Sequence, residues 1–99
     1  MLGREAKPTC WSLYESVTFD SMRITSRDWS SYPILRFSAV PERIDVHVID
    51  RPGQPFLGTG EAAQGPTAAC LANAVADATG VRIRELPLTS KRVKAAIGV

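Results

Sequence analysis

The sequence has no apolar run long enough to cross a bilayer, which takes about 20 residues as a helix. Its first residues also lack an apolar core of signal-peptide length. We therefore predict no transmembrane segment. By default this indicates a cytoplasmic location, and a periplasmic one stays open through partners that carry an export signal.

Metal-binding and clustered basic residues are scarce too. The sequence has two cysteines, Cys10 and Cys70, and one histidine, which are too few to predict a metal site. The lack of a secretory signal favours free thiols. We expect Cys70 to be buried in a helix. A disulfide between the two is the alternative. Twelve Lys and Arg against ten Asp and Glu give a net charge of +2, without the basic stripe of nucleic-acid binders. We predict no nucleic-acid partner, and interpret the cluster at 91–94 as the solvated face of a short helix.

What is present fits one small domain over residues 1–99, because 44% apolar and 22% charged residues are ordinary for a globular protein. Residues 1–10 show no periodicity and are interpreted as an irregular lead-in. Apolar and polar residues then alternate over 12–25, which predicts a β-hairpin turning at Asp20-Ser21. The clearest predicted strand is 44–50, where Ile44, Val46 and Val48 share one face.

Two helices are expected in the second half. Residues 67–79 are alanine-rich on nearly all sides, with Pro66 suited to the first turn and Gly80 to the end, which predicts a buried helix. A chain of this length has few other elements that could cover this helix. We therefore expect a partner or self-association. A short strand at 81–84 and a C-terminal helix capped by Thr89 complete a predicted α+β fold.

The glycine-rich loop before the first of these helices is the candidate site. Gly58-Thr59-Gly60-Glu61 places one carboxylate among flexible glycines, where backbone amides near a helix N-terminus can hold an anion and a bulky partner can approach. The third glycine of a dinucleotide-binding fingerprint is missing. From the residues alone, Glu61 is either functional or a loop glutamate stabilised by the helix dipole.

A longer series of motifs resembles a known family over about residues 11–97. The series resembles the extreme C-terminus of the molybdopterin-binding subunit of the xanthine dehydrogenase/aldehyde oxidase family, in the isoquinoline 1-oxidoreductase and nicotinate dehydrogenase branch. The motifs that carry it are, in order, 32–37, Pro41-Glu42, 44–50, 58–61, 65–69, 72–74, 78–80, 82–84 and 86–88.

The resemblance implies a fragment of a molybdenum cofactor-binding domain in an oxidoreductase that hydroxylates aldehydes or N-heteroaromatics with water-derived oxygen. In that family the glutamate of this motif is the general base beside the molybdenum, which maps to Glu61, with Gly58 and Gly60 in the loop near the centre. Many relatives have proline after this glutamate, whereas this chain has Ala62.

Relatives carry several hundred residues upstream, which supply most contacts to the pterin. The implied partners are therefore the remainder of that subunit and an iron–sulfur subunit, and the isolated chain is expected to bind no molybdopterin and to be inactive. A split subunit, a truncated reading frame and an excised domain all fit this length. The alternative function is a non-catalytic remnant or an oligomerising structural module.

Overall fold

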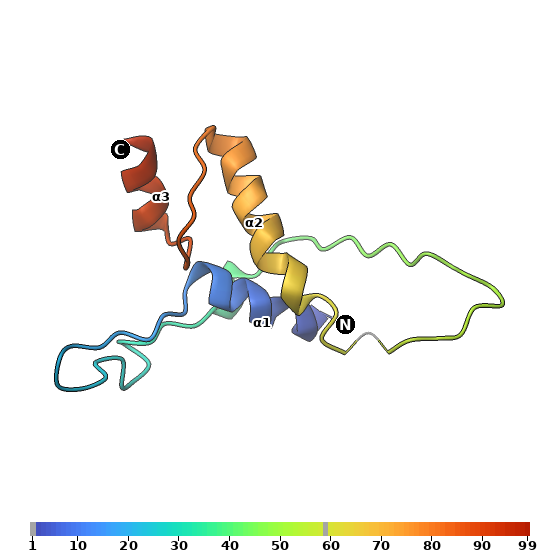
Figure 1. The fold of residues 1–99 in the computed structure, drawn as a ribbon, viewed down its shortest axis with the longest axis horizontal. Helices are drawn as coiled ribbons and strands as arrows, with labels where there is room; N and C mark the ends of the chain where they lie inside the picture. The colour runs from blue at the N-terminus through green and yellow to red at the C-terminus, as the bar shows by residue number, and fades with distance from the viewer. Residues whose placement is uncertain (1, 59) are drawn as a thin grey trace.

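The computed structural model describes residues 2–58 and 60–99. Three helices, α1 (Leu2–Leu13), α2 (Gln64–Thr79) and α3 (Ser90–Ile97), and one 3-10 turn, η1 (Phe37–Ala39), are joined by long irregular segments (Figure 1). α1 packs against α2, and residues 40–58 form a long open loop that projects away from the helices (Figure 1). None of the described helices combines the length and the apolar character needed to cross a membrane.

α1 corrects the prediction of an irregular lead-in over residues 1–10, of which Met1 lies outside the described residues. Sequence periodicity does not show this helix, and it contains Pro8. Its last turns are held by one local and one tertiary contact: the Ser12 hydroxyl donates to the Pro8 carbonyl within the helix (2.7 Å), and the Leu88 N–H donates to the Ser12 carbonyl (2.6 Å). α1 also packs against α2. Packing rather than helix propensity therefore stabilises α1.

The core formed around this contact is very small. Cys10, Ser12 and Leu88 are 7%, 2% and 4% exposed, and within the described residues no large side chain is completely buried. The Leu35 N–H donates to the Cys10 sulfur (2.9 Å), which ties the segment after the 28–32 turn to the same point. These contacts join α1 to the segment that leads into α3.

α2 lies where the sequence predicts a helix, and begins three residues earlier. Pro66 falls in its first turn, where a backbone N–H is not needed, and Gly80 ends it with a φ of 73°. The predicted burial is absent in this chain, because α2 has no buried residue. Cys70 is exposed, which corrects the prediction that it is buried, and Cys10 is a buried thiol; both cysteines are free as predicted. The reason is that no described element besides α1 packs extensively against α2.

α3 confirms the predicted C-terminal helix and its cap. The Thr89 hydroxyl accepts a hydrogen bond from the Arg92 N–H (3.2 Å). The Arg92 guanidinium donates to the Pro87 carbonyl (2.5 Å) and pairs with Glu85 (2.7 Å). The basic cluster is thus only partly a solvated face, because Arg92 turns back onto the connection that precedes the helix.

The three predicted β segments do not form strands within the described residues. The turn at Asp20-Ser21 is present, but the pairing around it stops at a single antiparallel bridge, Phe19 to Ile24. Residues 44–50 and 81–84 are not in strands either. A strand needs a neighbour to pair with its backbone, and the described part of this chain supplies none. The place of these segments in a larger cofactor-binding domain remains a prediction.

Much apolar surface consequently stays uncovered. The accessible area is 8356 Å², against about 5,500 Å² for a compact protein of 10.7 kDa. The radius of gyration is 16.6 Å, against about 13 Å for a compact domain of this length. The apolar side chains that are at least three-quarters exposed are Phe19, Met22, Trp29, Phe37, Val48, Ile49, Phe56, Leu57 and Val99.

We expect the isolated chain to self-associate, because exposed apolar surface of this extent favours association. Sedimentation velocity over a range from low to high micromolar should show a concentration-dependent rise in mean mass. A strictly monomeric species at high micromolar concentration would refute the expectation.

The turn at 28–31 gives a pH-dependent prediction. Oδ1 of Asp28 accepts hydrogen bonds from the hydroxyl (2.6 Å) and N–H (3.1 Å) of Ser30 and from the hydroxyl (2.8 Å) and N–H (2.9 Å) of Ser31. The hydrogen bonds, led by the Ser30 hydroxyl, lower the pKa of Asp28 from 3.8 to about 2. The turn should therefore be intact above pH 4 and open as the pH falls towards 2. NMR shifts of the Ser31 amide should follow this, and a midpoint near pH 4 would contradict it.

Candidate functional site

Glu61 lies on the exposed turn that leads into α2. Its carbonyl accepts a hydrogen bond from the Gln64 N–H (3.0 Å), which fixes the backbone of the turn against the first helical residue. Its carboxylate is solvent-exposed, and no hydrogen bond or ion pair to it is found within the part of the chain that the structure describes. The position thus presents a free carboxylate outward from the fold.

This geometry bears on the alternative role for Glu61 as a cap of α2. The N-cap residue of α2 is Ala63, and no side chain caps it. The Ala63 carbonyl instead accepts bonds from the N–H (3.3 Å) and hydroxyl (2.5 Å) of Thr67. The Glu61 side chain therefore contributes no capping hydrogen bond, and only a long-range interaction with the helix dipole is left for a structural role.

Gly58 and Gly60 are exposed, and Thr59 between them lies outside the described residues. A Cβ added at either glycine would meet no atom within 4 Å, and neither has a positive φ. Nothing in the local fold therefore requires glycine at these two positions. A requirement for it would come from a body that approaches this loop from outside the chain.

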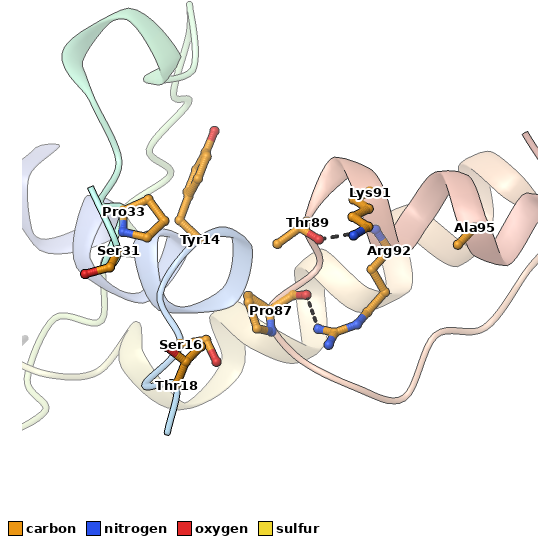
Figure 2. Close-up of a pocket in the computed structure, with 10 residues that line it drawn as sticks. All are labelled: Tyr14, Ser16, Thr18, Ser31, Pro33, Pro87, Thr89, Lys91, Arg92 and Ala95. Carbon is orange, nitrogen blue, oxygen red and sulfur yellow. Dashed lines mark hydrogen bonds between the residues drawn. The ribbon is translucent and has the colours of Figure 1, made fainter. Parts of the chain in front are cut away.

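A cavity of about 550 Å³ lies away from this loop, between the segment that follows α1 and the region around α3 (Figure 2). Tyr14 and Pro33 line one side and Thr89 and Arg92 the other, with Pro87 between them (Figure 2). Ser16, Thr18, Ser31, Lys91 and Ala95 complete the lining. None of the sequence-predicted site residues lines this cavity. The Arg92 guanidinium already forms an ion pair with Glu85 and a hydrogen bond to the Pro87 carbonyl.

The groups with displaced pKa values also lie away from Glu61. Burial, and then the Glu15 side chain, raise the pKa of Cys10, and the hydrogen bond from the Tyr32 hydroxyl to Glu15 (2.6 Å) raises the pKa of Tyr32. The hydrogen bond between Tyr32 and Glu15 joins the 28–32 turn to the residues that follow α1. Sequence reasoning missed this cluster, because its members are far apart in the chain and share no motif.

The described residues contain no group of three His, Cys, Asp or Glu side chains that could hold a metal ion. The glycine-flanked loop offers a single free carboxylate and open space around the backbone of its glycines. It does not form a cradle. A cofactor at this loop would have to be held mainly by residues of another chain segment.

No protein-family model matches the sequence. Among curated proteins, the chain is similar to one subunit of the nicotinate dehydrogenase of Pseudomonas putida, with 46% identity over 96 residues. The match covers 97% of this chain and 8% of that relative. The candidate site thus lies in a chain that is similar, over nearly all of its length, to a short fragment of a dehydrogenase subunit.

Proposed function

We propose that this chain is the glutamate-bearing segment of a molybdenum hydroxylase, and that it supplies Glu61 to an active site completed by other parts of the enzyme. The observation that carries the proposal is the free, outward-facing Glu61 carboxylate on a loop whose glycines have no packing role. Similarity to a dehydrogenase subunit over nearly the whole chain supports it.

In the proposed reaction Glu61 is the general base. Its carboxylate takes the proton from a water-derived oxygen as this oxygen joins an electron-poor carbon of the substrate. Gly58 and Gly60 let the cofactor's edge come close to the backbone. The C–H bond at that substrate carbon breaks in the same reaction, and molybdopterin, when bound, would supply the centre that accepts this hydrogen with its two electrons. The electrons would then pass on to an iron–sulfur partner. The substrate class is an aldehyde or an N-heteroaromatic, and nicotinate, after which the relative is named, is one example of the second kind.

A graft tests the proposal. The 96 matched residues of this chain replace their counterparts in the related subunit of the Pseudomonas putida enzyme, and the holoenzyme is assayed for molybdenum content and nicotinate turnover. We expect the graft to bind molybdenum and turn over, and a deletion of the same stretch to do neither. A graft that binds molybdenum but shows no turnover would contradict a catalytic contribution from this segment.

The alternative function is a non-catalytic oligomerising module, and the exposed apolar side chains support it. It predicts that the state of association changes with concentration while Glu61 is dispensable in every assembly. The graft separates the two functions, because an oligomerising module has no reason to restore turnover to a dehydrogenase.

A further inference from the structure

The extended segment 43–50 leads from the helices towards the Glu61 loop. We propose that it is a donor strand, which pairs with a β-sheet in the remainder of the molybdopterin-binding subunit. The inference rests on the proposed function, which supplies that remainder. It adds the means by which the segment docks.

The backbone of this segment is unpaired. Within the described residues, no hydrogen bond involves a main-chain N–H or C=O between 41 and 50, and the next one along the chain joins the Gln54 N–H to the Arg51 carbonyl (3.2 Å). Figure 1 shows the segment at the start of the long loop that projects away from the helices. A row of free donors and acceptors without proline is the feature that a sheet edge recognises.

One contact within the segment fits the side-chain alternation of a strand. Arg43 and Asp45, two residues apart, form an ion pair (2.7 Å) with both side chains largely exposed. In an extended backbone such a pair lies on one face, and Ile44, Val46 and Val48 lie on the other. Ile44 is half-buried, Val46 is 46% exposed and Val48 is 80% exposed, so this apolar face is only partly covered within the described residues and is most open at Val48.

A sheet satisfies both features at once. A helix or a small ligand would cover the apolar face but leave the alternating N–H and C=O groups without partners, whereas a neighbouring strand pairs them and its sheet supplies an apolar layer. The chain spans 8% of the relative's length, so the rest of such a subunit is the body available to provide that sheet. Docking at 43–50 would fix the start of the loop that carries Gly58 and Glu61.

Hydrogen exchange measured residue by residue tests the inference in the grafted holoenzyme. Amides between 44 and 50 should exchange about 10²-fold or more slowly than in the isolated chain at low micromolar concentration. Fast exchange of these amides in both the holoenzyme and the isolated chain would overturn the donor strand. Slow exchange in both samples would overturn the assigned partner, because it would show pairing between copies of this chain.

Proline substitutions give a second readout. Neighbouring N–H groups of a strand point to opposite sides, so at least one of Val46→Pro and His47→Pro should remove a ladder donor and lower the amount of molybdenum-loaded enzyme severalfold. Glu42→Pro, just before the alternating run, is the matched control and should leave loading unchanged. Normal loading in both variants would overturn the inference.

The outcome is separable from that of the proposed function. Free exchange at 44–50 in a graft whose turnover depends on Glu61 would remove the donor strand and leave the general base in place. Protected amides at 44–50, in a graft whose Glu61→Gln variant stays fully active, would support the donor strand and remove the general base.

Discussion

We expect Glu61→Gln to abolish turnover in the grafted enzyme while the molybdenum content stays unchanged. The amide has the shape of the carboxylate but does not accept the proton, and loss of a general base costs a factor of about 10²–10⁴. The upper end is expected, because the attacking oxygen keeps its proton. Since Glu61 is exposed and its side chain has no partner among the described residues, the substitution should leave the fold intact.

The control for this variant is Glu42→Gln, which removes an exposed glutamate outside the glycine-rich loop. It should change neither turnover nor loading. A purely structural Glu61, acting through the dipole of α2, would give a stability loss of about 0.3–1 kcal/mol with turnover retained. Thermal midpoint, bound molybdenum and turnover measured on one preparation distinguish these results, and an active Glu61→Gln enzyme would remove the catalytic assignment.

We expect the isolated chain to retain no stoichiometric molybdopterin and to show no oxidoreductase activity. The described residues provide one free carboxylate at a glycine-flanked loop and no cluster of metal ligands, which is too little to hold a large anionic cofactor. Elemental analysis and an activity assay on the purified chain check this, with the grafted holoenzyme as the positive control. Stoichiometric molybdenum in the purified chain would show that it holds the cofactor without the remainder of the subunit.

The elements that could be predicted from the sequence are those with local signals. Pro66, Gly80 and Thr89 mark helix ends through their own backbone or hydroxyl groups, and they hold these positions in the structure. α1 has no such signal. Its last turns depend on the contact between Ser12 and Leu88, which are 76 positions apart along the printed sequence, so only the tertiary structure reveals it.

The predicted strands are not formed in the described part of the chain, and the reason is different. The alternation over 44–50 is a real property of the sequence, but a strand exists only with a neighbour, and the chain does not contain one in its described part. The same holds for the burial of α2, whose alanines have no second layer to contact. For the candidate site, the sequence predicts Glu61 in a loop close to a helix N-terminus, and the structure has it on an exposed turn before α2. In the proposed function its role depends on groups outside this chain.

The most direct test of Glu61 as the base of a larger active site is a crystal structure of the grafted holoenzyme with substrate bound. We predict a Glu61 carboxylate oxygen within hydrogen-bond reach of the reacting oxygen, about 2.6–3.2 Å away or through one water. A Glu61 side chain that faces bulk solvent in that complex, as it does in the isolated chain, would contradict its role as the base.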